Sequence, residues 1–396
     1  MTMKSIKEIS FKGKKVFIRV DFNVPFNDNG EITDNSRIVA ALPTINHVLL
    51  NGGACILASH LGRPKGKTEK LSLIKLLPEL KRLLEIDVAF SDNCIGDQTK
   101  EACHNLNNGE VLLLENLRFY KEEIIADIGF AKELSSLADV YINDAYGTTH
   151  REHASTATIA KFFTEKCPGL LLQKEINSLK KLMHKPKKPL TAIIGGAKVS
   201  SKISVISNTL GFVDNLIIGG GMAYTFIKNN GGRIGDSIFE ADRLRDCSEI
   251  LSKAKQKKVK VFLPEDVLCS NEFSEDGLKK VTDIYEVPEG WQGLDIGPKT
   301  VDKFKQVIQG SSTILWNGPM GVFEIPAFEK GTHAVAKAVA KATQNGAYSL
   351  IGGGDSVAAI KKFNLQNQVS FISTGGGAML ESLEGKLLPG IKAFSQ

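Results

Sequence analysis

The stretch Leu190-Thr191-Ala192-Ile193-Ile194-Gly195-Gly196 places a short apolar run directly before a pair of glycines. Three further runs in the same half of the chain lead into glycine turns, at Gly219, at Gly352 and at Gly375. Such runs are typical of buried parallel strands, and ligands of open α/β sheets bind beyond the carboxyl ends of the strands. Glycines at those ends let backbone N–H groups approach an anion closely, so the four turns predict a crevice for phosphate groups.

Short apolar runs alternate with longer helical patterns along the whole chain, mostly about 25 to 40 residues apart, which is the spacing of βαβ units. The pattern therefore predicts an α/β fold of two doubly wound, Rossmann-like lobes, each with a parallel sheet. The predicted strands are 16–20, 54–58, 88–90, 111–114 and 140–142 in the first half, and 190–194, 216–218, 259–263, 313–316, 348–351 and 369–372 in the second.

The division into lobes follows from the length and from one proline-rich segment. A chain of 396 residues exceeds what one ordinary core supports. Lys185-Pro186-Lys187-Lys188-Pro189 cannot continue a helix, whereas the residues before it have a helical pattern. We expect an N-terminal domain at 1–169, a connecting helix at 170–185 and a C-terminal domain at 186–388.

Composition and charge narrow the classes of function. The net charge is +6, and the basic cluster at 253–260 lacks the aromatic residues that a nucleic-acid groove would need. Six cysteines form no C-x-x-C pair, which argues against a zinc site and a disulfide framework. Neither an apolar leader in residues 1–10 nor a run near the ~20 apolar residues of a membrane span is present. We expect a cytoplasmic protein without nucleic-acid or membrane partners.

The first half places charged and hydrogen-bonding side chains after its predicted strands. Arg63, Arg118 and Arg151 fall at or just beyond the carboxyl edge of one sheet, and Arg37 can reach the same edge. The planar fork of arginine suits phosphate and carboxylate oxygens. A single loop arginine would favour a surface ion pair, but three at equivalent strand ends, with His60 nearby, predict a shared anion pocket.

Asp21 and Asn23 lie two residues apart where the chain leaves the first predicted strand. Their side chains then share a face and could hold a substrate hydroxyl. An Asx-turn that closes the strand explains the same spacing equally well.

The second half supplies Lys198 and Lys202 after its first glycine pair. Four residues apart on an incipient helix, they would fall on one face and form a polyphosphate site, the alternative being two solvated lysines. The pattern is not a P-loop, and no G-x-G-x-x-G fingerprint supports a nicotinamide cofactor. Asp355, directly after three glycines, is the candidate magnesium ligand or else a helix N-cap. Glu324 is a candidate ribose ligand or else a surface glutamate.

Two basins follow from these residues, one rich in arginine and one rich in glycine and lysine. Together they suit phosphoryl transfer between a nucleotide and a small phosphorylated acid, which needs positioning and charge neutralisation more than a covalent nucleophile. The alternative is a two-lobed protein that binds a small anion or a nucleotide without catalysis. A nicotinamide-dependent dehydrogenase is a third and weaker interpretation.

At these residues the chain closely resembles the phosphoglycerate kinase family. The matching stretches are 19–25, 59–64, 115–119, 150–155, 195–203, 316–324, 352–356 and 373–377. The resemblance implies two α/β lobes around a hinge, a monomer, and reversible transfer of the acyl phosphate of 1,3-bisphosphoglycerate to MgADP, giving 3-phosphoglycerate and MgATP. It also implies direct in-line transfer after the hinge closes.

The resemblance assigns roles to particular residues. The substrate-binding set would be Asp21, Asn23, Arg37, His60, Arg63, Arg118 and Arg151. The nucleotide-binding set would be Lys202, Gly293, Glu324, Gly352, Gly353, Gly354, Asp355 and Ser356, with Asp355 linked to Mg²⁺. The catalytic set would be Arg37, Lys198, Gly375 and Gly376. The family's final residues return to the first lobe, so residues 389–396 are expected to pack there.

Three positions depart from the family's usual pattern. Ser201 stands where aspartate is common, Glu152 where a small residue is usual, and Glu265 where valine is common. None of the three removes an expected ligand.

Overall fold

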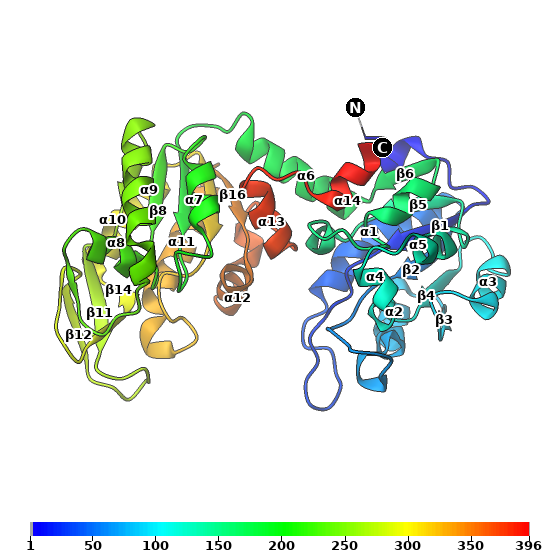
Figure 1. Cartoon of the computed structure of the whole chain (residues 1–396), viewed down its shortest axis with the longest axis horizontal. Coiled ribbons are helices and arrows are strands. Elements are labelled where there is room, and N and C mark those ends of the chain that lie inside the picture. The colour runs from blue at the N-terminus through cyan, green and yellow to red at the C-terminus, as the bar shows by residue number, and fades with distance from the viewer. Residues whose placement is uncertain (1–2, 396) are drawn as a thin grey trace. The chain divides into compact units, whose positions relative to one another are not determined.

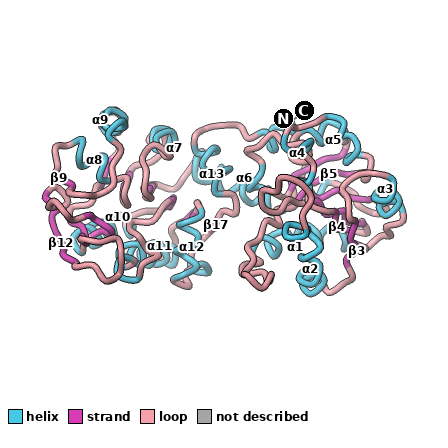
Figure 2. The backbone as a smooth tube through the Cα atoms, turned by 60° about the horizontal axis from the view of Figure 1, so that its bottom comes forward, coloured by secondary structure: helices cyan, strands magenta, loops and turns pink. Residues whose placement is uncertain are grey.

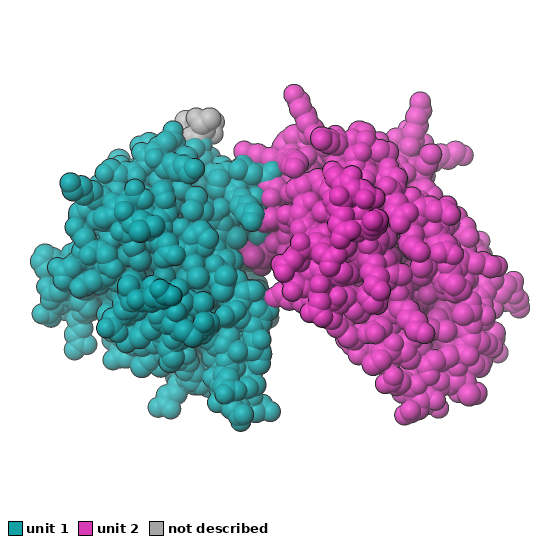
Figure 3. Space-filling view, turned by 180° about the vertical axis from the view of Figure 1, so that it is seen from behind, with its two compact units in different colours: residues 1–177, 387–396 teal, residues 178–386 magenta. Residues whose placement is uncertain are grey.

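The computed structural model describes residues 3–395; Met1, Thr2 and Gln396 lie outside the described residues. The chain divides into two compact units, residues 1–177 with 387–396 (unit 1) and residues 178–386 (unit 2), which Figure 3 draws in different colours. Helix α6 (Leu170–Met183) runs from one unit into the other and occupies most of the segment predicted to be a connecting helix.

Unit 1 is built on six parallel strands in the order β3-β4-β2-β1-β5-β6. The strands are β1 (Lys15–Arg19), β2 (Ala54–Ala58), β3 (Val88–Ser91), β4 (Val111–Leu114), β5 (Val140–Asn143) and β6 (Glu165–Pro168). The helices are α1 (Ser36–Leu50), α2 (Leu77–Leu84), α3 (Asp97–His104), α4 (Lys121–Ile124), α5 (Ile128–Ser135) and α14 (Pro389–Lys392). All five predicted strands are confirmed, whereas β6 was not predicted because its sequence, Glu-Lys-Cys-Pro, has no apolar run.

Both faces of this sheet are covered, as in a doubly wound fold. Val16 and Ile18 of β1 belong to a core cluster with residues of α1 and α2. Phe17, between them, belongs to a second cluster with residues of α5. Because successive strand residues point to opposite faces, helices lie on both sides of the sheet. Figure 2 shows α1 and α2 on one side of the strands of unit 1 and α4 and α5 on the other.

The last described residues belong to unit 1. The backbone N–H of Gly390 in α14 donates to the carbonyl of Thr149 at 2.9 Å. The rings of Phe394 and Tyr141 stack with centroids 6.2 Å apart, and Ala393 lies in the second core cluster of the unit.

Unit 2 repeats the architecture with six parallel strands in the order β10-β8-β7-β15-β16-β17. Strands β8 and β16 of this sheet are labelled in Figure 1. These are β7 (Leu190–Ile194), β8 (Asn215–Ile218), β10 (Lys260–Phe262), β15 (Thr313–Asn317), β16 (Tyr348–Ile351) and β17 (Phe371–Ile372), all six predicted. The helices are α7 (Ile203–Thr209), α8 (Ala223–Asn229), α9 (Leu244–Gln256), α10 (Pro298–Gln309), α11 (Lys330–Gln344), α12 (Gly354–Lys362) and α13 (Gly376–Leu383).

Two small sheets in unit 2 were not predicted. One is antiparallel, in the order β12-β11-β14, with β11 (Asp266–Ser270), β12 (Lys279–Asp283) and β14 (Gln292–Ile296). The other pairs β9 (Arg233–Ile234) with β13 (Glu286–Val287). Within residues 3–395 no helix combines the length and the apolar character that a membrane span requires.

Candidate functional site

The predicted site residues of unit 1 follow strands β1, β2, β4 and β5, whose carboxyl ends share one edge of the sheet. Strand β1 pairs with β2 on one side and with β5 on the other. The order in which successive strands are added to the sheet therefore reverses at β1. This is the kind of switch point at which open α/β sheets bind ligands. The loops after β1 and β5 begin in contact, because Asp144 N–H donates to Arg19 O at 2.8 Å.

Asp21, just beyond β1, is a nearly buried carboxylate with three neighbours. Its Oδ2 accepts a 2.6 Å hydrogen bond from Nη1 of Arg37, in the first turn of α1. Its Oδ1 lies 3.9 Å from Nδ1 of His60 and accepts from the backbone N–H of Asn23 at 3.2 Å. The last contact is the predicted Asx-turn. Asp21 therefore both shapes the loop and orients the Arg37 side chain.

Gly62 joins the loops that follow β1, β2 and β4. Its N–H donates to Oδ1 of Asn23 at 2.8 Å, and its carbonyl accepts from Nη1 of Arg118 at 2.6 Å. Its φ of +62° is a left-handed conformation that glycine adopts without strain. Arg63 follows directly, with its side chain exposed. The structure thus brings Asn23 and Arg118 together around one turn.

Several guanidinium groups act on one buried imidazole. Burial, and then the charges of Arg19, Arg118, Arg37 and Arg151, hold the pKa of His60 well below its ordinary value. His60 is therefore neutral near pH 7 and can donate or accept one hydrogen bond. Of the four arginines predicted at this edge, Arg37, Arg118 and Arg151 act on His60, whereas Arg63 is not among the charges that lower its pKa. The ligand-binding roles of all four stay predictions.

Two buried charged residues, Arg19 and Glu123, were not predicted as site residues and lie next to this cluster. Arg19 is fully buried, with Nη2 3.3 Å from Nδ1 of His60, and its Nε donates to Oγ of Ser155 at 2.9 Å. Ser155 in turn donates to Oε1 of the buried Glu123 at 2.6 Å. A signal existed for Arg19, because it is the only charged residue inside the predicted strand 16–20.

In unit 2 the corresponding switch point lies between β7 and β15. Strands β8 and β10 extend the sheet on one side of β7, and β15, β16 and β17 extend it on the other. Gly195 N–H donates to Asn317 O at 3.0 Å. Gly318 has a φ of +106°, and a Cβ there would lie 2.1 Å from the carbonyl oxygen of Gly195. Only glycine allows this approach of the two loops.

Lys202 reaches back across this switch point. Its Nζ donates to Oδ1 of Asn317, and Nδ2 of Asn317 donates to the carbonyl of Gly352 at 2.8 Å. Burial lowers the pKa of the Lys202 ammonium to about 8, against the opposing effect of the Asp355 charge.

Helix α7 begins only at Ile203, because the chain after Gly196 runs through turns up to Ser201. The prediction that Lys198 and Lys202 share a helix face is therefore wrong. Lys198 lies exposed in the loop, and its carbonyl accepts from Oγ of Ser201 at 2.9 Å.

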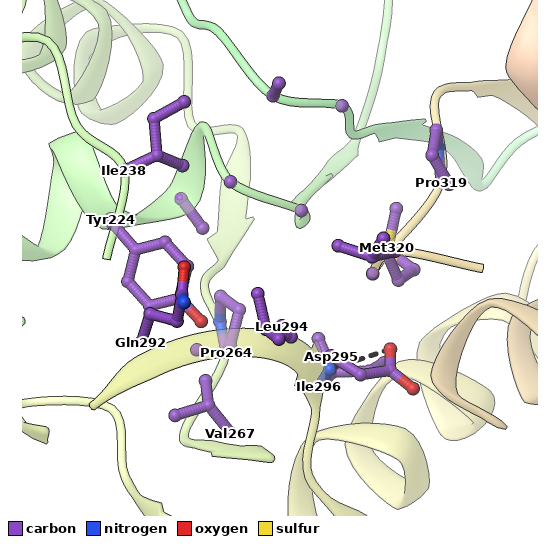
Figure 4. Close-up of a pocket in the computed structure, with 18 of the residues that line it drawn as sticks. Tyr224, Ile238, Pro264, Val267, Gln292, Leu294, Asp295, Ile296, Pro319 and Met320 are labelled. Carbon is purple, nitrogen blue, oxygen red and sulfur yellow. Dashed lines mark hydrogen bonds between the residues drawn. The ribbon is translucent and has the colours of Figure 1, made fainter. Parts of the chain in front are cut away.

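A cavity of about 650 Å³ opens beside these loops, within the 300–1,000 Å³ typical of sites for small molecules. Its lining is mostly apolar and includes Tyr224, Ile238 and Met320 (Figure 4). Three predicted nucleotide ligands also line it, namely Gly293, Glu324 and Asp355. The side chain of Glu324 is exposed, so a ligand in the cavity could reach it.

Gly293 and Asp295, both on β14, shape the wall of this cavity. A Cβ at Gly293 would lie 1.7 Å from Oη of the buried Tyr224, so the strand touches the ring directly. Asp295 accepts from Gly331 N–H at 2.6 Å and from Ile296 N–H at 2.9 Å, the latter bond being visible in Figure 4. Burial raises the pKa of the Asp295 carboxyl to about 7, although these hydrogen bonds oppose the rise.

Asp355 lies in the first turn of α12, whose N-cap is Gly353. The alternative that Asp355 caps the helix is therefore wrong, and its exposed carboxylate lines the cavity instead. Among residues 3–395 no group of three or more His, Cys, Asp or Glu could hold a metal ion. A cation at Asp355 would thus need further ligands from the bound molecule and from water.

The remaining glycine turns lie beside Asp355. Oγ of the next residue, Ser356, accepts from Gly318 N–H at 2.5 Å. A Cβ at Gly376, in the first turn of α13, would lie 3.5 Å from Cα of Gly353, so these two turns are adjacent. Gly375 is the N-cap of α13, and its N–H donates to Oγ of Ser373 at 3.3 Å, while Gly354 opens α12.

The three atypical positions leave these contacts intact. Glu152 is exposed, and Glu265 pairs with Lys303. Ser201 donates within its own turn, as described above.

Comparison with known proteins agrees with this geometry. A family model described as phosphoglycerate kinase matches residues 6–386. A phosphoglycerate kinase of Porphyromonas gingivalis is 49% identical over 98% of this chain and 99% of its own length. Phosphoglycerate kinase 3, cytosolic, of Arabidopsis thaliana is 50% identical over 99% of this chain and 98% of its own length. The solved phosphoglycerate kinase of Coxiella burnetii superposes with a TM-score of 0.91 at 41% identity, covering 100% of this chain and 99% of that one. The chain belongs to the phosphoglycerate kinase family.

Proposed function

We propose that the chain catalyses reversible transfer of the acyl phosphate of 1,3-bisphosphoglycerate to ADP, with unit 1 binding the phosphoglycerate and unit 2 the nucleotide. Its family makes it a phosphotransferase of glycolysis. The observation that carries the division of roles is the charge of the two sites. Four guanidinium groups act on His60 in unit 1, whereas the cavity of unit 2 has a mostly apolar lining.

In unit 1, the phosphate and carboxylate of 3-phosphoglycerate would be bound by Arg63, Arg118 and Arg151. Arginine forks bind such groups through paired hydrogen bonds. His60 would contribute a neutral N–H or nitrogen lone pair, because its low pKa prevents it from adding another positive charge. Asn23 and Asp21 would hold the substrate hydroxyl.

In unit 2, the base would lie against the apolar wall beside Gly293, and Glu324 would accept from the ribose hydroxyls. Lys202 would bind the nucleotide phosphates, exchanging its bond with Asn317 for phosphate oxygens. The phosphate site would be completed by four further residues of the predicted nucleotide-binding set, namely the backbone of Gly352, Gly353 and Gly354 and the side chain of Ser356.

Magnesium fits this site because the Asp355 carboxylate lines the cavity beside the adjacent glycine turns of α12 and α13, where the nucleotide phosphates would lie. Mg²⁺ is commonly held by one or two carboxylates together with substrate phosphates. When bound, it would neutralise charge on the phosphates during transfer.

Direct transfer requires that the two bound substrates meet, so we propose closure about residues 185–189, at the end of the connecting helix. Arg37 would stabilise the phosphoryl group in flight, held in position by its 2.6 Å bond to Asp21. Lys198 and the N–H groups of Gly375 and Gly376 would stabilise the same charge. No covalent intermediate is needed, because positioning and charge neutralisation supply the catalysis. The chain would work as a monomer.

The test is MgATP-dependent phosphorylation of 3-phosphoglycerate, coupled to NADH oxidation through glyceraldehyde-phosphate dehydrogenase. Arg37→Ala should lose turnover by about 10²-fold or more with nucleotide affinity unchanged, the range for a group that stabilises transition-state charge. Arg82→Ala is the matched control, because Arg82 pairs with Glu79 on the surface of α2. Equal losses of turnover and affinity would make Arg37 a binding residue. Absence of turnover in folded protein that binds MgATP would favour the binding-protein alternative.

We also propose a cytoplasmic location. One Arabidopsis thaliana relative is named cytosolic and another, 49% identical, is named chloroplastic. Fractionation of the source cells decides between the compartments.

A further inference from the structure

Lys198 is the only proposed catalytic side chain of unit 2, yet it lies in a loop rather than on a helix or strand. The loop between β7 and α7 spans residues 195–202, and Lys198 is exposed near its middle. A catalytic ammonium must lie within a few tenths of an ångström of its working position, so a loop that carries one needs support from a second layer of residues.

That support comes from one carboxylate distant in sequence. Both oxygens of Glu240 bind Ser200, two residues after Lys198. Oε2 accepts from the backbone N–H at 2.9 Å, and Oε1 accepts from Oγ at 2.5 Å. Burial alone would raise the pKa of Glu240, but hydrogen bonds from Ser200 and Val199 and the charge of Lys198 lower it. Glu240 is therefore ionised at neutral pH and holds two consecutive residues of the loop.

Glu240 is itself attached to the wall of the nucleotide cavity. Its backbone N–H donates to Oγ1 of Thr225 at 3.2 Å, and Thr225 is buried on α8 next to Tyr224, which lines the cavity. Ile238, two residues earlier, lines the cavity together with Ala197 of the loop. The segment 238–240 thus spans the distance from the cavity wall to the loop.

We propose that Glu240 is a positioning residue that fixes the Lys198 ammonium relative to the terminal phosphate of the nucleotide. This inference rests on the proposed catalytic role of Lys198. Because Glu240 acts through Lys198, its removal should lower kcat and leave the KM values for both substrates nearly unchanged. A carboxylate that only stabilised the fold would not show this dependence on Lys198.

The experiment compares kcat and KM for Glu240→Ala, Lys198→Ala and the double variant. Glu240→Ala should lose kcat by about tenfold, since misplacing a catalytic group by about 1 Å costs up to 10²-fold. The double variant should be no slower than Lys198→Ala alone, because the two effects belong to one unit. Glu240→Gln can still accept from the Ser200 N–H and should recover most of the loss. Glu249→Ala is the matched control, because Glu249 forms an exposed pair with Arg245 on α9.

The outcomes separate this inference from the proposed function. An unchanged kcat in Lys198→Ala would refute the catalytic role of Lys198 and, with it, the positioning role of Glu240. A slow Lys198→Ala beside a Glu240→Ala of wild-type rate would refute the inference alone. A double variant markedly slower than Lys198→Ala, or a raised nucleotide KM in Glu240→Ala, would assign Glu240 to the structure of the cavity and overturn its positioning role.

Discussion

Nucleotide affinity should depend on pH through Lys202, whose burial lowers its pKa to about 8. If only the ammonium form binds phosphate, the apparent Kd for ADP rises by the factor 1 + 10^(pH − pKa). Between about pH 7 and about pH 9 this factor grows roughly tenfold, whereas a lysine of ordinary pKa, about 10.4, would change it by only a few per cent. Binding near pH 8 should also take up about half a proton per ADP, because half of the free protein carries the neutral amine.

Calorimetric titration with ADP in buffers of different ionisation enthalpy measures both quantities. Lys202→Arg should remove the pH dependence, because a guanidinium stays charged throughout this range. Lys198→Met is the matched control and should keep it, since Lys198 is exposed. If the wild type binds ADP equally well at both pH values and Lys202→Met still weakens binding, the low pKa of Lys202 is refuted. If Lys202→Met binds as well as the wild type, the contact between Lys202 and the phosphates is refuted.

Three further predictions concern single contacts. Gly293→Ala should raise the KM for ADP about 10-fold or more and leave that for 3-phosphoglycerate unchanged in steady-state assays, because the new methyl group displaces Tyr224 into the cavity. Arg118→Lys should raise the KM for 3-phosphoglycerate and leave that for ADP unchanged, because lysine cannot bind Gly62 O and a ligand at the same time as the arginine fork can. Equal KM changes for both substrates would contradict this prediction. The free energy of unfolding of Asp295→Asn, relative to that of the wild type, should be about 2–3 kcal/mol higher at pH 8 than at pH 5 in urea unfolding. The reason is that the raised pKa of folded Asp295, about 7, makes the wild type lose stability as pH rises from about 4 to about 7. A pH-independent difference would mean that Asp295 is ionised throughout.

The central sheets were predictable because their strands are buried on both faces. Every residue of β7 is buried, and its sequence is apolar except for Thr191. Strand β12 instead alternates between exposed and half-buried residues and carries two lysines, so no apolar run marks it. The same reason applies to β6, an edge strand with two charged residues. The edge strands β3, β10 and β17 keep apolar residues and were predicted, so a strand was missed where its sequence lacks an apolar run.

Site residues were predictable where topology alone brings them together. Arg118 and Arg151 could be grouped because the carboxyl ends of parallel strands share an edge. Arg19 was missed because its buried contact with His60 depends on where the side chain points, not on its place in the chain. Glu240 carries no signal either, because only the fold brings it to Ser200.

The packing of residues 387–395 onto unit 1 has a consequence for biosynthesis. A ribosome releases the chain from its N-terminus, and domains generally fold as they emerge. Unit 2 is contiguous, so it can complete its core as soon as its own residues are outside the tunnel. Unit 1 cannot do so, because Phe394 stacks on Tyr141 and Ala393 joins the core of the unit only after the whole of residues 178–386 has been translated. Until then the nascent N-terminal unit presents an unfinished apolar face to chaperones and to neighbouring chains on the same polysome.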